Sequence, residues 1–109
     1  MSLIDVIIDC LNKVKAKDIL NYDMTGRSPF FDNMILASVE SERQASAVIT
    51  YIKEETFLNG YNVRSVEGAE TAWVIIDCYD VIVSVFTRSE REHFALEKIY
   101  MDVPYKKVD

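Results

Sequence analysis

The stretch 73-WVIIDCYDVIVSVF-86 decides the fold that this sequence predicts. It contains two runs rich in β-branched residues, 73–76 and 81–86, which are separated by Asp77, Cys78, Tyr79 and Asp80. Such runs favour strands, and four intervening residues with two aspartates suit the turn of a hairpin. Because side chains alternate along a strand, the second run should divide between the two faces of a sheet. One face receives Val81, Val83 and Val85, and the other receives Ile82, Ser84 and Phe86.

Two amphipathic helices are predicted on the amino-terminal side of this hairpin. The first runs from Leu3 to Val14, where apolar residues recur at helical spacing behind Ser2, which can cap the helix. The second begins at Ser41–Gln44, a capping box in which each side chain can bond to the backbone amide of the other residue. It should end by Gly60, because glycine readily adopts the left-handed conformation just past a helix.

A third helix is predicted on the carboxyl-terminal side of the hairpin. Ser89 and Glu92 form a second capping box. Apolar residues then follow at Leu96, Ile99 and Tyr100. Pro104 lies just beyond them and should end the helix, because proline cannot continue its hydrogen-bonding pattern.

Three further segments supply strands. The apolar run from Asn33 to Val39 is too short for a helix and suits a buried strand. Residues Tyr61 to Val66 alternate as a strand should, and Asp18 to Met24 alternate more weakly. The predicted order is α, β, β, α, β, β, β, α. This order indicates an α/β (α+β) fold, in which a sheet with a central hairpin carries helices packed on its faces.

Length and charge limit the classes of function. A chain of 109 residues, half of them apolar, predicts a single globular domain over residues 1–109. The net charge of −6, without any basic run, argues against direct sequence-specific binding of nucleic acid. An acidic surface suits a basic protein partner, because complementary charge steers encounter. Moderate acidity is equally consistent with a role in solubility alone.

The cysteines and histidine give no sign of a metal centre. Cys10 and Cys78 are far apart and lie in apolar runs, and His93 is the single histidine, so the common zinc spacings are absent. Buried thiols of this kind behave as small hydrophobes. The chain opens with no charged segment followed by a cleavable apolar stretch, and no apolar run has the length of a membrane span. A cytoplasmic location, away from membranes, is therefore expected.

No motif predicts catalysis or a cofactor. The sequence has no glycine-rich phosphate loop and no nucleophile elbow. Asp77 and Asp80 are three residues apart and could hold a hard cation or share a proton. Aspartate is also a favoured turn residue, and the Gly-Ser turn and D-x-D pair of a nucleotidyltransferase are missing. We expect no enzyme; the alternative is a nucleotidyltransferase-like enzyme or nucleotide binder that uses Asp77 and Asp80.

Aromatic and acidic residues gather in the last third of the chain. Trp73 opens a strand and Tyr79 occupies the hairpin tip, positions at which we expect large side chains to project toward solvent. Trp, Tyr and Arg are the usual anchors of protein interfaces. A binding module is therefore favoured over an enzyme.

Four blocks of the sequence, taken in order, resemble the ribosomal silencing factors of the RsfS/Iojap family. The first is 32-DNMILASVESERQ-44, the second is Glu67-Gly68, the third is the hairpin 73–86, and the fourth is 91-REHFALEKIYMDVP-104. The sequence departs from the family pattern at single positions. Val39 and Tyr79 replace glycines, Cys78 replaces a tyrosine, Ser84 replaces a histidine, and Tyr100 replaces a tryptophan. These departures are typical of a divergent member or of a paralogue.

The resemblance implies a mixed sheet related to the nucleotidyltransferase fold but without its catalytic residues. It also implies binding to ribosomal protein number fourteen of the large ribosomal subunit, on the face where the small subunit docks. The bound factor would obstruct subunit joining and so lower translation when nutrients are scarce. A further alternative to this function is a homodimeric interaction protein with another partner. The free silencing factor is itself a possible homodimer.

The residues expected to bind the partner come from the last two blocks and their neighbours. They are Trp73, Asp77, Tyr79, Asp80, Glu90 and Arg91. Asp32 and Arg43 are expected to act as structural supports.

Overall fold

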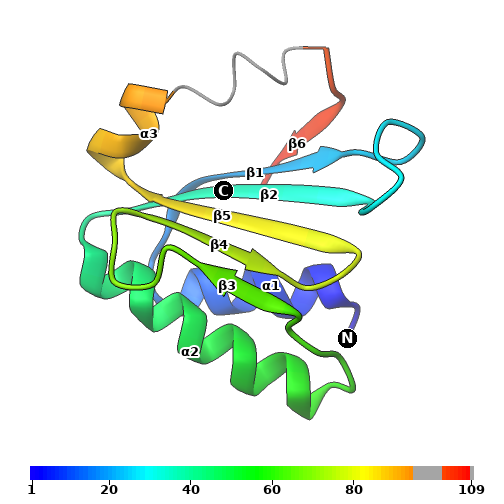
Figure 1. Ribbon diagram of the computed structural model, residues 1–109, viewed down its shortest axis with the longest axis horizontal. Helices are drawn as coiled ribbons and strands as arrows, with labels where there is room; N and C mark the ends of the chain where they lie inside the picture. Colours follow the sequence, from blue (N-terminus) through cyan, green and yellow to red (C-terminus); the bar gives the residue numbers. More distant parts are fainter. Residues whose placement is uncertain (95–101, 109) are drawn as a thin grey trace.

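The computed structural model describes residues 1–94 and 102–108, which form three helices and one mixed sheet (Figure 1). The elements in chain order are α1 (Leu3–Lys13), β1 (Lys17–Asp23), β2 (Asn33–Val39), α2 (Glu42–Leu58), β3 (Ser65–Glu67), β4 (Trp73–Asp77), β5 (Val81–Thr87), α3 (Arg88–Phe94) and β6 (Tyr105–Lys107). The strands lie side by side in the order β3-β4-β5-β2-β1-β6. β2 and β5 are parallel, and every other neighbouring pair is antiparallel. The predicted α+β fold with a mixed sheet is confirmed.

Side-chain caps fix the starts of the two long helices. The Ser2 hydroxyl accepts a hydrogen bond from the Asp5 amide at 3.2 Å. The Ser41 hydroxyl likewise accepts from the Gln44 amide at 3.2 Å. Gln44 completes its capping box one residue earlier than predicted, since its Oε1 accepts from the amide of Glu40 at 2.9 Å. Both helix starts that the sequence predicts on this side of the hairpin are therefore confirmed.

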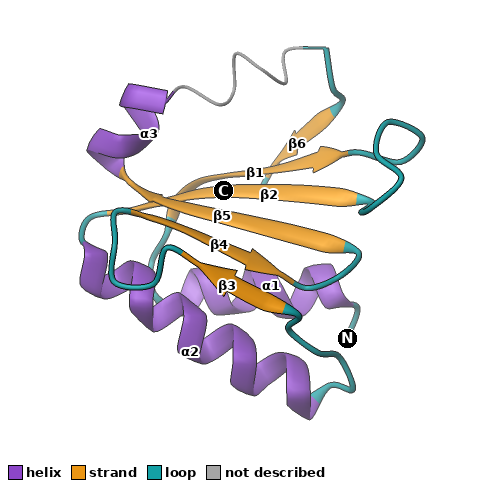
Figure 2. Ribbon diagram, viewed as in Figure 1, coloured by secondary structure: helices purple, strands orange, loops and turns teal. Residues whose placement is uncertain are grey.

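The two faces of the sheet are covered differently. Both α1 and α2 pack on one face (Figure 2), which we call the helix face. The alternating residues Val81, Val83 and Val85 of β5 belong to the core on that side. Phe86, at 1% exposure, and Ile82 belong to a smaller cluster on the opposite face. Neither α1 nor α2 covers this face, and we call it the open face. The predicted alternation along this strand is confirmed.

The hairpin turn is tighter than predicted. Asp77 is the last residue of β4, so only residues 78–80 connect the strands, closed by a hydrogen bond from the Cys78 amide to the Val81 carbonyl at 2.9 Å. Tyr79 at the tip has a φ of +69°, in the left-handed region that favours glycine. This is the position at which the family pattern carries glycine, so tyrosine here holds a backbone conformation that glycine adopts without strain.

The predicted strand over 61–66 is mostly wrong. β3 covers only Ser65–Glu67, and the residues before it lead from the end of α2 to the edge of β4. The Tyr61 amide donates to the Thr56 carbonyl at 2.8 Å, which closes the end of α2 past Gly60. The Arg64 amide donates to the Asp77 carbonyl at 2.7 Å.

The carboxyl-terminal region also differs from the prediction. α3 begins at Arg88 directly after β5, so Ser89 is the second residue of the helix and cannot be its cap. Leu96, Ile99 and Tyr100, the apolar residues predicted for this helix, lie outside the described residues. A short strand that the sequence did not predict, β6, follows Pro104 and pairs antiparallel with β1 at the edge of the sheet.

Candidate partner-binding site

A strip of side chains runs along β4 on the open face of the sheet. Trp73, Ile75 and Asp77 alternate with the fully buried Val74 and Ile76, and all three strip residues are half-buried. The strip is roughly 13 Å long, given the rise of a strand per residue. Its register partners on β5 are Phe86, Ser84 and Ile82. We call Trp73, Ile75, Asp77 and the half-buried Ile82 the hairpin strip.

Trp73 lies against the sheet instead of projecting into solvent, so that prediction is wrong. Its ring stacks on Phe86, its register partner, with ring centroids 4.9 Å apart and an angle of 21° between the rings. It also packs against the open-face cluster of Tyr22, Met24, Met34, Leu36 and Phe86. The Trp73 side chain thus stabilises the open-face cluster by packing against it, while part of the residue stays exposed to solvent.

The tip of the hairpin is organised by Asp77. Its Oδ2 accepts hydrogen bonds from Arg64 Nη2 at 2.8 Å and Nε at 3.1 Å. Its Oδ1 accepts from the Tyr79 amide at 2.9 Å, which closes an aspartate turn. The Arg64 guanidinium also lies over the ring of Tyr79, 4.8 Å from the centroid. Both oxygens of Asp77 are therefore engaged, and a cation bound there would meet the positive charge of Arg64.

Tyr79 and Asp80 are the most accessible of the predicted site residues. Tyr79 is 48% exposed, as predicted for the tip, and the Asp80 side chain is exposed beside it. The carbonyl of Asp80 accepts hydrogen bonds from the amides of Asp32, at 2.7 Å, and Asn33, at 3.2 Å. Asp32 thus supports the tip through its backbone, as expected. The same contact brings the loop before β2, with the 78% exposed Phe30, to this end of the sheet.

Glu90 and Arg91 lie at the other end of the hairpin strip, on α3 (Figure 1). Nη1 of Arg91 donates to the Asp18 carbonyl at 2.6 Å and to the Ser38 hydroxyl at 2.9 Å. Arg91 therefore fastens α3 to β1 and β2. Glu90 is half-buried, and Arg43, expected as a support, is exposed on α2.

The six predicted residues do not form one cluster. Trp73, Glu90 and Arg91 lie at one end of the β4–β5 pair, and Asp77, Tyr79 and Asp80 lie at the other. A typical protein interface covers about 800 Å² on each partner, a patch roughly 30 Å across. One partner on the open face can therefore contact both ends. Sequence reasoning missed Ile75 and Arg64: only the placement of the helices shows which face of β4 is open, and no spacing signal links Arg64 to Asp77.

The described residues show no metal centre. Among residues 1–94 and 102–108, no three histidine, cysteine, aspartate or glutamate side chains are grouped so as to hold a metal ion. Both cysteines are free and buried. Burial raises the pKa of the Cys78 thiol to about 12 and that of the Cys10 thiol to about 11, which keeps both protonated and poorly reactive at neutral pH. None of the helices in the described part of the chain combines the length and apolarity that crossing a membrane requires.

Comparison with known proteins gives a consistent family. The family model described as "Ribosomal silencing factor during starvation" matches residues 1–109. The chain is 34% identical to the ribosomal silencing factor RsfS of Bacillus subtilis, over 99% of this chain and 92% of that protein. It is also 34% identical to RsfS of Haemophilus influenzae, over 92% of this chain and 99% of that protein.

Two solved structures share the fold of this chain. A crystal structure of a protein from Chromobacterium violaceum superimposes with a TM-score of 0.85 at 28% identity, covering 91% of this chain and 83% of that one. A crystal structure of a protein from Bacillus halodurans gives a TM-score of 0.84 at 29% identity, covering 97% of both chains. The family match spans every residue of the sequence, and the chain belongs to the ribosomal silencing factor (RsfS) family.

Proposed function

We propose that this protein docks on the large ribosomal subunit, through ribosomal protein number fourteen of that subunit, and hinders joining of the small subunit. Membership of the ribosomal silencing factor family carries the proposal. In this account the protein represses translation in the cytoplasm by occupying space that the joined ribosome needs. The bound protein itself is the obstacle, and no catalytic step is required.

The open face supplies the surface for docking. The hairpin strip leaves apolar area half-exposed, while the helix face of β4 and β5 is covered by the helices. A large aromatic that is partly buried and rigidly held is a common anchor of an interface, and Trp73 stacked on Phe86 has that character. We assign partner contact to the six residues Trp73, Asp77, Tyr79, Asp80, Glu90 and Arg91, and add Ile75 and Ile82 between them.

Charge favours a basic protein as the partner. The chain carries a net charge of −6, and the exposed Asp80 and half-buried Glu90 flank the apolar strip at its two ends. Arg64 neutralises Asp77, so the fixed negative charge near the tip comes from the exposed Asp80 and its neighbour Asp32. Complementary charge of this kind raises the rate of encounter more than the final affinity.

The enzyme alternative has no support in the geometry of the two aspartates. Asp77 is committed to Arg64 and to the turn, so it cannot act with Asp80 as a cation-binding or proton-sharing pair without breaking those bonds. We therefore propose that the protein has no catalytic activity. When free, two copies could instead pair through the same half-exposed strip.

Sedimentation through sucrose gradients tests the proposal. Tagged protein mixed with purified subunits should travel with free large subunits, should be absent from joined ribosomes, and should reduce the joined fraction when added before the small subunit. Retention should weaken as salt rises, because exposed charge pairs are screened over about 8–10 Å at physiological ionic strength. Protein that stays at the top of the gradient at low salt, with large subunits in excess, would refute the proposal.

A further inference from the structure

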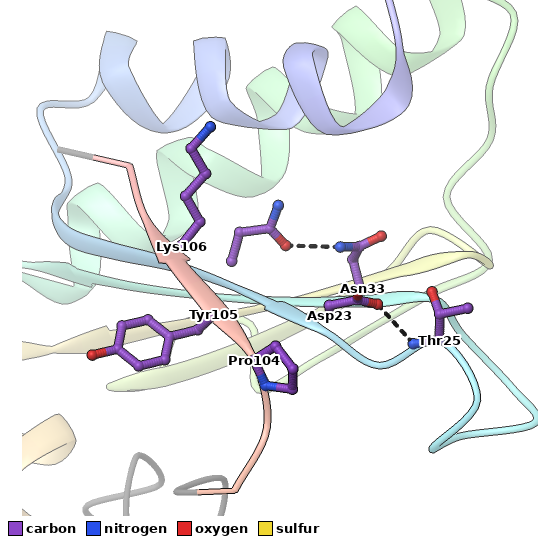
Figure 3. A pocket seen from close by; sticks show the side chains of 7 residues that line it. Asp23, Thr25, Asn33, Pro104, Tyr105 and Lys106 are labelled. Atoms are coloured by element: carbon purple, nitrogen blue, oxygen red, sulfur yellow. Dashed lines mark hydrogen bonds between the residues drawn. The ribbon is translucent and has the colours of Figure 1, made fainter.

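A polar pocket of about 440 Å³ lies on β1, β2 and β6, away from the hairpin strip (Figure 3). Its charged and amide side chains are Asn21, Asp23, Asn33 and Lys106. Asn21 and Asp23 follow Ile19, a core residue of the helix face, at alternate positions of β1. The pocket is therefore on the helix face, at the edge of the sheet where the apolar core gives way to polar side chains.

The register of three strands brings these four side chains together. Asn21 lies opposite Lys106 across β1 and β6, and Asp23 lies opposite Asn33 across β1 and β2. Directly opposed residues of antiparallel strands have Cβ atoms roughly 5 Å apart. Figure 3 shows Lys106 and Asn33 on the same side of the strands, and Tyr105 pointing to the other side. A carboxylate, an ammonium group and two amides thus share one small surface.

Three of these side chains are already held in position. Asn33 Nδ2 donates to Asn21 Oδ1 at 3.0 Å and lies 3.5 Å from the carbonyl oxygen of Tyr22. This arrangement leaves Asn33 Oδ1 as an acceptor and Asn21 Nδ2 as a donor for a ligand. Asp23 Oδ1 accepts from the Thr25 amide at 3.0 Å, a bond that lowers the pKa of the carboxyl and keeps it ionised. No ion pair joins Asp23 to Lys106 in the described structure, and the positive charge of Arg27 also favours the ionised form of Asp23.

The mixture of charges selects the ligand. A bare cation would meet the ammonium group of Lys106, and a phosphate would meet the carboxylate of Asp23. A molecule with both charges satisfies both, and the pocket volume is at the low end of the range for small-molecule sites. We propose that this pocket binds a free α-amino acid, with its ammonium group on Asp23 and Asn33 Oδ1 and its carboxylate on Lys106 and Asn21 Nδ2. The inference is independent of ribosome docking.

Calorimetric titration of the full chain with individual α-amino acids tests this site. At least one amino acid should bind saturably, and about tenfold or more tighter than its N-acetyl derivative, its methyl ester, acetate or methylammonium, each of which lacks one of the two charges. Magnesium and inorganic phosphate should not bind. Absence of saturable binding by every amino acid, or equal binding of the singly charged analogues, would overturn the proposal, as would binding of magnesium or phosphate at this pocket.

Variants locate the binding. Asp23→Asn and Lys106→Met should each weaken amino-acid binding about tenfold or more, because each removes one charge contact. Asparagine can still accept from the Thr25 amide, so Asp23→Asn should keep the turn, and a thermal melt checks this. Lys107→Met is the matched control: Lys107 pairs with Leu20 in β1, whereas Lys106 pairs with Asn21, so its side chain lies on the other face. Unchanged binding in Asp23→Asn and Lys106→Met, or equal loss in Lys107→Met, would contradict the assignment.

Discussion

Ile75 and Ile76 are the same residue type, are adjacent in β4, and have different surroundings. Ile76 is fully buried in the core beneath α1 and α2, whereas Ile75 is half-buried in the hairpin strip on the open face. The difference comes only from the alternation of side chains along a strand and from the placement of both long helices on one face. It shows that one strand can bury one face in a closed core and leave the other face half-exposed.

The largest expected effect separates these two isoleucines. Ile76→Ala should lower the free energy of unfolding by about 3 kcal/mol, because the truncation leaves a cavity in a closed core. Ile75→Ala should cost only about 1 kcal/mol, since part of that side chain is already in solvent. Urea denaturation of both variants measures the difference. Equal losses would mean that the two faces are equally closed and would break the comparison.

Arg91 and Arg88 give a second contrast, within α3 beside the open face. Arg91→Ala should cost about 1.5 kcal/mol of unfolding free energy, because a charged donor is lost from the Asp18 carbonyl and the Ser38 hydroxyl. Arg88→Ala removes only an exposed ion pair with Glu40, at 3.0 Å, and should cost less than about 0.5 kcal/mol. Thermal melts of the pair would show whether Arg91 fastens α3. A loss in Arg88→Ala that matches the loss in Arg91→Ala would argue against that role.

At Tyr79, in the hairpin tip, the glycine variant should be more stable than the alanine variant, which reverses the usual order of stability. At most positions inside a strand or helix, a protein with glycine is less stable than the same protein with alanine by about 0.5–1 kcal/mol. With a φ of +69°, Tyr79→Gly should be more stable than Tyr79→Ala by about 1 kcal/mol, because only glycine adopts this conformation without strain. Both variants lose the contact with Arg64, so the comparison isolates the backbone. If Tyr79→Ala unfolds at a higher denaturant concentration than Tyr79→Gly, the backbone at the tip is not strained.

The smallest effect concerns helix caps. Ser41→Ala should cost about 1 kcal/mol, since Ser41 caps α2 on the helix face. Ser89→Ala should cost less than about 0.5 kcal/mol, because Ser89 is exposed and lies inside α3 instead of preceding its first residue. Melting temperatures of the two variants test this. A larger drop in Ser89→Ala would restore the helix start that the sequence predicted.

Local patterns predicted the parts of the fold that depend on neighbouring residues. The strand Asn33–Val39 was predicted with its correct bounds, because an apolar run buried on both faces needs no periodicity to be recognised. The caps at Ser2 and Ser41 are defined within three residues and were also predicted. β6 was missed because its three residues are exposed and form a strand only by pairing with β1, far away in the sequence. The capping box at Ser89 was misleading because β5 passes directly into α3.

The candidate site was predicted less completely than the fold. The turn chemistry of Asp77 and the exposure of Tyr79 follow from local sequence, and the structure shows both. The stacking of Trp73 on Phe86 depends on strand register, which the sequence alone did not give. The ion pair between Arg64 and Asp77 joins segments thirteen positions apart and has no spacing signal. The ring stacking and the ion pair depend on how the strands pair in the fold, which residue type alone does not determine.

Binding of purified large ribosomal subunits by Ile75→Lys, compared with Thr50→Lys, tests most directly whether the open face is the docking surface. The two variants add the same charge, one on the hairpin strip and one on an exposed position of α2. Lysine can place its ammonium group in solvent at a half-buried position, so both proteins should fold, as circular dichroism will check. We expect Ile75→Lys to weaken binding about tenfold or more and Thr50→Lys to change it less than about twofold. Equal affinities of the two folded variants would contradict docking through the open face.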